Sequence, residues 1–280
     1  MKIYGLDFTS APSKRKPITC ACCVIGGLEQ RVLRLESLQT FLTFADFEAF
    51  LAREGPWLAG IDAPFGQPRK LIENLGLPQD WADYVTAFAE LGKPGFADLI
   101  KTYKSKRASG DKEHLRVCDE LAGAISPMKL SFVPVGKMFY ELAPRLMASG
   151  VHVPPVHEGD KSRVVREAYP GLLVRSFLGK LSYKNDTSAK QTLLQKEARV
   201  RIIELLEQAE FHQTYGVQVS LSTDQKTILI QDPKADTLDA LLCAAQAAWA
   251  SQDDYAMPET AGFEGWIADP HLARNQRSKI

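Results

Sequence analysis

Four aspartates of this chain stand where an apolar segment ends or begins, namely Asp7, Asp62, Asp236 and Asp239. The first two close the apolar segments 3–6 and 57–61, and the other two open an apolar pattern at helical spacing over 238–249. A carboxylate beside buried strands costs roughly several kcal/mol unless it is paired or binds a metal ion. Four such positions therefore indicate a fold that brings these acids to one shared cation.

The order of apolar patterns predicts an α/β fold with a mixed sheet. Segments 2–8, 17–25 and 30–36 are typical of three antiparallel strands, followed by a helix over 44–51 and a fourth strand over 58–63. A fifth strand is expected over 163–169, and helices over 193–209 and 238–249. Strand–helix–strand crossovers make strands one, four and five parallel neighbours, with helices on both faces of the sheet.

The segment between the fourth and fifth strands has a different character. Residues 67–160 favour helices, at 81–91, 96–104 and 138–147, with the first two separated by the Lys-Pro-Gly sequence of 93–95. We therefore expect one domain over 1–280 that carries a helical insertion over 67–160. In the third strand, leucines alternate with charged residues, which is typical of a half-exposed edge strand.

Composition bounds the possible partners. The 34 Lys and Arg residues balance the 34 Asp and Glu residues, so nucleic-acid binding would have to come from a local basic patch. The sequence contains no apolar run of the ~18 residues that a membrane span needs. Asp7 interrupts the N-terminal apolar segment before it reaches the length of a signal peptide. A cytoplasmic protein is the expectation.

The cysteines and histidines argue against zinc or disulfides. An odd number of cysteines, with three of them inside 20–23, is not typical of a disulfide framework, and we expect free thiols buried as small apolar side chains in a central strand. The five histidines are scattered and form no His-Glu-x-x-His motif, and the chain has no Cys-x-x-Cys pair.

The predicted topology brings the acids together. In a parallel arrangement the carboxyl ends of strands one and four are adjacent, which places Asp7 beside Asp62. Asp236 and Asp239 lie three residues apart, one turn from each other on one helix face. Carboxylate oxygens suit Mg²⁺ or Mn²⁺, and two such ions ~4 Å apart suit hydrolysis of a phosphodiester by an activated water.

Each acid also has a purely structural interpretation. Asp236 would cap its helix, with Asp239 in the first turn facing the positive end of the helix dipole. Asp7 and Asp62 would form hydrogen-bonded turns after their strands. Glu167, at the end of the fifth strand, is a candidate metal ligand or a partner of one, and its structural alternative is an ion pair with Arg166 or Arg175.

Four short segments carry a resemblance to a known family. They are IYGLDF at 3–8, GIDAPFG at 60–66, EAYP at 167–170 and DTLDALLCA at 236–244, and they resemble the motifs of little-characterised proteins described as predicted ribonuclease H-like nucleases. The wider superfamily is similar in having an Asp on its first strand, an acid at the end of its fourth strand, and acids on a late helix.

The resemblance implies a ribonuclease H-like fold and a metal-dependent nuclease that cuts DNA or RNA. It implies Asp7, Asp62 and Asp239 as ligands of Mg²⁺ or Mn²⁺, with Asp236 accompanying them. The nearest acid layout is that of Holliday-junction resolvases, whose late helix carries the same three-residue spacing. This chain departs from them at the fourth strand, where Asp62 stands in place of the usual Glu.

A nuclease must also hold a polyanion, so basic and hydroxyl residues are the candidates for substrate binding. The segment 101–112 supplies Lys104, Lys106 and Arg107, and the turn after the first strand supplies Thr9 and Ser10. A second basic cluster lies at 14–16. Solvated loops and turn hydrogen bonds are the structural alternatives for these positions.

Two other functions remain open at this stage. Actin-like ATPases and sugar kinases also begin with a strand that ends in Asp before hydroxyl residues, although Phe8 stands where their phosphate loop needs glycine. The third possibility is a non-catalytic nucleic-acid-binding or scaffold module on the same fold.

Overall fold

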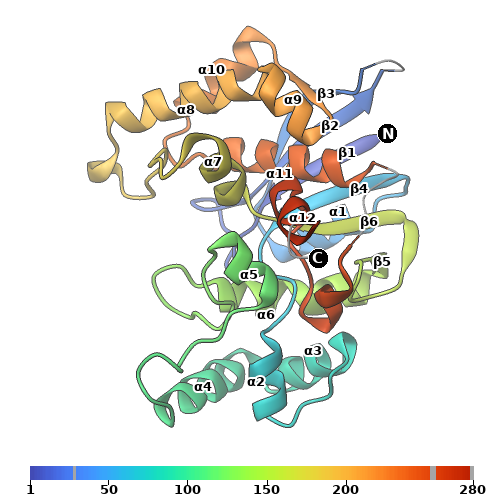
Figure 1. Ribbon diagram of the computed structural model, residues 1–280, viewed down its shortest axis with the longest axis vertical. Coiled ribbons are helices and arrows are strands. Elements are labelled where there is room, and N and C mark those ends of the chain that lie inside the picture. The colour runs from blue at the N-terminus through green and yellow to red at the C-terminus, as the bar shows by residue number, and fades with distance from the viewer. Residues whose placement is uncertain (28–29, 253–256, 278–280) are drawn as a thin grey trace.

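The computed structural model describes residues 1–27, 30–252 and 257–277, and contains a seven-stranded sheet in the order β5-β6-β4-β1-β2-β3-β7 (Figure 1). The strands are β1 (Lys2–Asp7), β2 (Ile18–Gly26), β3 (Val32–Phe41), β4 (Trp57–Asp62), β5 (Val151–His152), β6 (Asp160–Ala168) and β7 (Gln218–Ser220). Strands β1, β2 and β3 are antiparallel, whereas β4 and β6 run parallel to β1. The predicted α/β class and mixed sheet are confirmed.

Two short strands extend the sheet beyond the predicted five. β5 pairs with β6, and β7 pairs with residues Val32–Arg34 of β3. The prediction that the third strand is an edge is therefore wrong over this part, although its alternation holds, with Leu33 and Leu35 buried and Arg34 exposed. Strands of two or three residues are too short to show a period in sequence.

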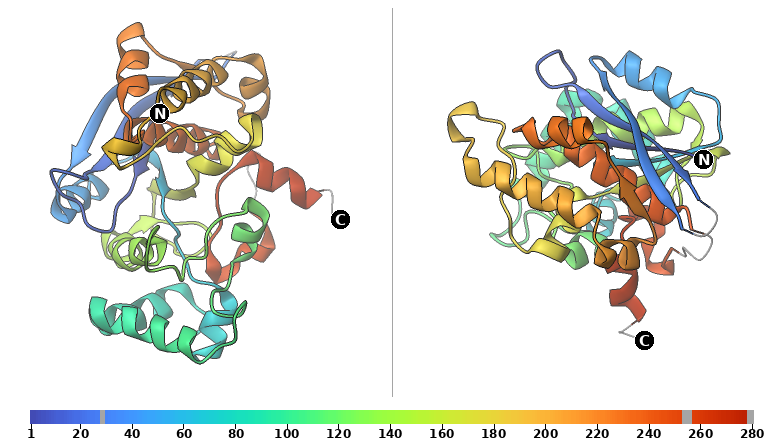
Figure 2. Two further views of the ribbon diagram at one scale, coloured as in Figure 1. Left: turned by 90° about the vertical axis from the view of Figure 1, so that its left-hand side faces the viewer. Right: turned by 90° about the horizontal axis from the view of Figure 1, so that it is seen from above.

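Helices cover both faces of the sheet, as predicted (Figures 1 and 2). One face packs against α7 (Pro170–Leu178), α8 (Leu193–Leu206), α9 (Ala209–Tyr215), α10 (Thr223–Gln231) and α11 (Asp236–Ala250). The apolar cluster on the other face includes side chains of α1 (Phe44–Leu51), α2 (Arg69–Asn74), α3 (Trp81–Glu90), α4 (Gly92–Ser105) and α6 (Val135–Ser149), with α3 packed on α6 and α4 on α3. A third apolar cluster joins α5 (Val117–Ala122) to the C-terminal segment, which holds the 3₁₀ helix Glu259–Glu264 and α12 (Pro270–Arg277). A further 3₁₀ turn spans Ser188–Lys190.

The helices α2 to α6 lie between β4 and β6, where the insertion was expected. In Figure 1 and the left view of Figure 2, α3 and α4 form the end of the molecule farthest from α8 and α10. The sequence 93–95 does not separate two helices, because it belongs to the first turn of α4, which begins at Gly92. Proline is tolerated in a first turn, where its missing N–H would have no partner.

Two glycines allow α11 to lie directly on the sheet. A Cβ atom on Gly5 of β1 would lie 1.9 Å from the Ala240 carbonyl oxygen, and one on Gly60 of β4 would lie 2.4 Å from that of Cys243. These close approaches bring the N-terminal turn of α11 against the carboxyl ends of β1 and β4. The glycines therefore set how near the helix acids come to the strand acids.

The cysteine prediction is confirmed for all five residues. They are free and buried, and Cys20, Cys22 and Cys23 lie on β2 inside the sheet. Among the helices in the described part of the chain, none is long and apolar enough to cross a membrane.

Candidate functional site

Asp7 and Asp62 end two neighbouring parallel strands and are paired in register. On β1, Ile3 belongs to the apolar cluster under α11, and Gly5 contacts α11, so alternation places Asp7 on the same face. The same alternation on β4 places Asp62 on that face too. The prediction that the two carboxylates meet at the carboxyl edge of the sheet is confirmed by this register.

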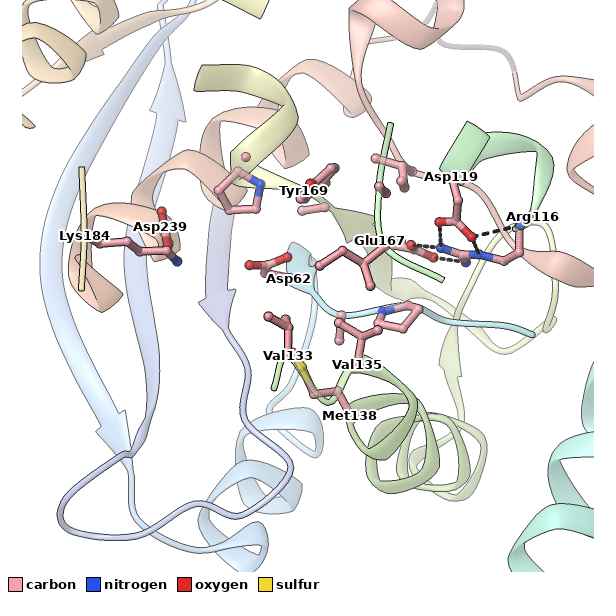
Figure 3. A pocket seen from close by; sticks show the side chains of 18 of the residues that line it. Asp62, Arg116, Asp119, Val133, Val135, Met138, Glu167, Tyr169, Lys184 and Asp239 are labelled. Atoms are coloured by element: carbon pink, nitrogen blue, oxygen red, sulfur yellow. Dashed lines mark hydrogen bonds and ion pairs between the residues drawn. The ribbon is translucent and has the colours of Figure 1, made fainter. Parts of the chain in front are cut away.

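Asp239 joins them from the first turn of α11 and is fully buried. The Tyr183 hydroxyl donates a hydrogen bond to Asp239 Oδ1 over 2.7 Å, and the ammonium of Lys184 is paired with Oδ2. The Lys184 side chain is 41% exposed, so it reaches from solvent into the acid cluster (Figure 3). A buried carboxylate with a cation and a hydroxyl on its two oxygens is satisfied as it stands.

Asp236 lies one turn earlier and is only partly buried. It does not cap α11, because the N-cap position is Ala235, with φ of 57° and no side-chain hydrogen bond. The loop carboxylate of Asp232 accepts the N–H and hydroxyl of Thr237 instead, over 3.0 and 2.9 Å. The interpretation of Asp236 as the cap of α11 is therefore wrong, and its carboxylate lies in the first turn of the helix.

The electrostatics of the cluster show unbalanced negative charge. Burial is the largest cause that raises the pKa of Asp62 to about 7; the charge of Lys184 opposes the rise, and the charges of Asp239 and Glu167 add to it. Burial likewise raises the pKa of Asp7 well above its ordinary value, and Asp239, Asp236 and Asp62 add to this rise against the effect of Lys184. Burial also raises the pKa of Asp236, followed by the charge of Asp232. One ammonium does not neutralise these acids.

The donor set suits a hard divalent cation. Asp7, Asp62 and Asp239 supply oxygen ligands of the kind that Mg²⁺ and Mn²⁺ prefer. The raised pKa values of Asp7 and Asp62 identify a place where added positive charge is favourable. Among residues 1–27, 30–252 and 257–277, no three acidic, imidazole or thiol side chains are arranged to hold a metal ion as they stand. In this conformation the Lys184 ammonium is the cation of the cluster.

Glu167 lies at the end of β6 and takes part in a buried ion network. Its Oε1 accepts a 2.6 Å hydrogen bond from Arg116, and its Oε2 accepts bonds from Arg116 and from the Phe65 backbone N–H. Asp119 binds the same guanidinium over 2.8 Å. Burial raises the pKa of Glu167, and Arg116 opposes this effect. The structural alternative for Glu167 was an ion pair with Arg166 or Arg175, and the observed partner is Arg116.

A pocket of about 410 Å³ joins the acid cluster to this network. Asp62, Asp239 and Lys184 lie toward one side in Figure 3, and Glu167, Asp119 and Arg116 lie toward the other. The remaining walls come from apolar residues of three regions, including Ile125, Val133, Val135, Met138, Leu181 and Ile267. The pocket therefore combines an acidic wall with an apolar interior, a composition typical of ligand sites.

The predicted substrate-binding residues are dispersed. Thr9 is buried and its hydroxyl accepts a 3.5 Å bond from the Ala11 N–H, as in a turn, while Ser10 is partly buried beside it. Lys104 lies in the last turn of α4, where its ammonium binds Glu113 over 2.6 Å and the Met128 carbonyl over 2.7 Å.

The other two basic candidates lie close to Lys104 in sequence. Arg107 binds Asp111 over 2.7 Å and stacks on Tyr103 at 4.1 Å from the ring centroid, whereas Lys106 is exposed. None of the three lines the pocket. Their role in substrate binding stays a prediction.

Sequence reasoning missed Lys184 and Tyr183, which contact Asp239. Lys184 and Tyr183 precede Asn185 and Asp186 in an irregular segment between α7 and α8. Lys16, from the second basic cluster, pairs with Asp186 over 2.9 Å. Burial acts to lower the pKa of Lys16, but Asp186 and the charge of Asp7 raise it overall. The only local sequence feature that pointed to a role for this segment is its aromatic and charged composition, Tyr-Lys-Asn-Asp at 183–186.

The family assignment rests on a match that spans most of the chain. Residues 5–261 match the model of a family described as a protein of unknown function (DUF429). The chain belongs to the DUF429 family. No curated protein and no solved structure matches it. The family match covers the carboxyl end of β1 and all of β4, β6 and α11, so it includes every acid of the cluster.

Proposed function

We propose that this DUF429 protein is a metal-dependent nuclease with a ribonuclease H-like fold, in which Asp7, Asp62 and Asp239 hold Mg²⁺ or Mn²⁺. The observation that carries the proposal is the meeting of two strand-end aspartates in register with a fully buried helix aspartate. The strand order β3-β2-β1-β4-β6, antiparallel and then parallel, supports the fold assignment.

The chain's own residues suit phosphodiester hydrolysis. When bound, a divalent ion supplies an activated water and charge stabilisation at the phosphate. Asp7 and Asp62 would hold it from the sheet, and Asp239 from α11. Lys184 leaves Asp239 in this scheme, and its ammonium then lies beside the anionic substrate. Asp236 stays within the field of the cluster as an additional acid.

Basic residues around the acids support a nucleic-acid partner. Lys184 and Lys16 lie on the solvent side of the cluster, and Lys234 binds the Arg15 carbonyl over 3.1 Å nearby. These cations form a local patch on a chain with no net charge. A patch of this kind attracts a phosphate backbone that the acids alone would repel.

The kinase-like alternative gains no comparable support. Phe8, directly after Asp7, is buried and packs against Phe44 and Phe47 with ring centroids 6.2 and 5.4 Å apart. A phosphate loop needs backbone N–H groups open to the ligand at this point. The turn after β1 instead inserts an aromatic side chain into the core.

The test is cleavage of labelled single-stranded and duplex DNA and RNA in the presence of excess Mg²⁺ or Mn²⁺. We expect cutting by the wild type, loss of cutting in Asp7→Asn, and unchanged cutting in Asp160→Asn, an exposed acid on β6. ATP hydrolysis without any nucleic-acid cutting would favour the kinase-like function. Nucleic-acid binding without either reaction would favour the non-catalytic module.

A further inference from the structure

The apolar part of the pocket beside the acids has no function in the proposal so far. Ile125 and Val133 line it and are 41% and 48% exposed, and Met138 lies next to Val133 in Figure 3. Tyr169 lies on the other side of Asp62 in the same view. Apolar side chains held open to water next to a polar site mark a surface that binds a partly apolar ligand.

Phe132, which directly precedes the pocket residue Val133 in sequence, adds a second observation. Its side chain is 99% exposed, and its backbone is left-handed, with φ of 63°. A bulky side chain in this region is strained, by roughly 1–2 kcal/mol, and here the strain gains no packing within the described chain. The neighbouring Val133 lines the pocket. The strain thus presents an aromatic ring to solvent beside the site.

The charges of the pocket define which part of a substrate enters it. At the end away from Asp239, the Arg116 guanidinium is hydrogen-bonded to both Asp119 and Glu167, so this end presents charges that are already paired. The phosphate belongs at the other end, with the metal-binding acids. The apolar interior of the pocket would then hold a flat, uncharged group that is attached to the phosphate.

We propose that the pocket binds the unpaired base of a nucleotide whose phosphodiester lies against Asp62 and Asp239, so that the protein acts on single-stranded rather than fully paired nucleic acid. A volume of about 410 Å³ is within the ~300–1,000 Å³ range of ligand pockets. In a duplex the bases are stacked and paired, so a base enters the pocket only at the cost of unstacking and unpairing it. This inference rests on the proposed function, since it places the phosphodiester at the same acids.

The first experiment measures base insertion directly. A 12-nucleotide single strand with one 2-aminopurine is titrated with protein in Ca²⁺, whose flexible coordination lets it stand in for the smaller ion. We expect the fluorescence to change as the base stacks on Tyr169, with binding at least tenfold tighter than for the same strand in a duplex. Adenosine monophosphate binding as tightly as the 12-mer would show that a free nucleotide is the ligand and would overturn the single-strand assignment.

Matched variants assign the effect to the pocket. Phe132→Ala and Ile125→Asp are both at exposed positions, and each should weaken single-strand binding about tenfold or more. Leu194→Ala on α8 and Ile228→Asp on α10 are the controls, because their side chains are 74% and 51% exposed and lie outside the pocket. Circular dichroism checks that all four variants keep the wild-type fold.

The outcomes separate this inference from the nuclease proposal. Cutting of duplex and single strand at equal rates would overturn the unpaired-base inference and leave the nuclease intact. Selective single-strand binding that Phe132→Ala and Ile125→Asp weaken, without any cutting in Mn²⁺, would sustain the base pocket and remove the nuclease. Light scattering that shows a dimer lost in Ile125→Asp would assign the apolar rim to a second copy of the chain and overturn the inference.

Discussion

Replacing Asp62 by Asn should stabilise the protein while removing a metal ligand. Burial and neighbouring acids raise the pKa of Asp62 from its ordinary value of 3.8 to about 7. The unfolded chain therefore loses this proton near pH 4, whereas the folded protein holds it until about pH 7. Because the folded state binds more protons over this range, stability falls as the pH rises from about 4 to about 7.

The magnitude follows from the size of the rise. Each pKa unit is worth about 1.4 kcal/mol, so ionised Asp62 costs up to about 4 kcal/mol above pH 7. Asn cannot ionise and avoids this cost. We expect the free energy of unfolding of Asp62→Asn to exceed that of the wild type by up to about 4 kcal/mol at pH 8, or about 8 °C in Tm at roughly 2 °C per kcal/mol. At pH 4 the difference vanishes.

The assay is urea unfolding in EDTA at pH 4, 6 and 8, and Asp160→Asn is the matched control. Hydrogen bonds from Ser162 and Arg163 lower the pKa of Asp160 to about 2. That carboxylate stabilises the fold above pH 4 and loses its effect as the pH falls toward 2, so Asp160→Asn should destabilise the protein at pH 8. An Asp62→Asn protein that is less stable than the wild type at pH 8 would refute the electrostatic argument.

Three further substitutions test other parts of the site. Lys184→Met removes the cation paired with Asp239 and should tighten Mn²⁺ binding about tenfold at pH 8. Electron paramagnetic resonance measures the binding, and Lys190→Met, at an exposed position, should leave it unchanged. Glu167→Gln breaks a buried ion pair and should cost about 3 kcal/mol in urea unfolding without weakening Mn²⁺ binding, whereas a large loss of Mn²⁺ would make this residue a ligand. Gly5→Ala forces α11 off the sheet and should lower stability by about 3 kcal/mol or more, and a wild-type Tm would contradict the packing.

The sheet and its acids were predictable because their signals are local. Alternation and turn residues located β1 to β4 and β6, and parallel pairing then placed Asp7 beside Asp62. The three-residue spacing on α11 located Asp239 in the same way. These predictions require only the spacing of apolar residues along each element and the direction in which each strand runs. Both can be inferred from a single sequence.

The partners of these acids depend on contacts between distant segments. Arg116 binds Glu167 from 51 positions away, and Lys184 reaches Asp239 from 55 positions away, out of a segment without a regular period. Neither pairing leaves a local pattern. The capping interpretation of Asp236 failed for a different, local reason, because the Asp232 carboxylate, five residues before Thr237, accepts the Thr237 N–H.

The central claim is that Asp7, Asp62 and Asp239 form a divalent-metal site. Its most direct test is a crystal of the protein in about 5 mM Mn²⁺, an excess that saturates a site of micromolar affinity, with anomalous scattering measured at the manganese edge. The account predicts a peak within about 2.2 Å of oxygens from these aspartates, with Lys184 displaced from Asp239. A map with no peak there, and with Lys184 still on Asp239, would contradict it.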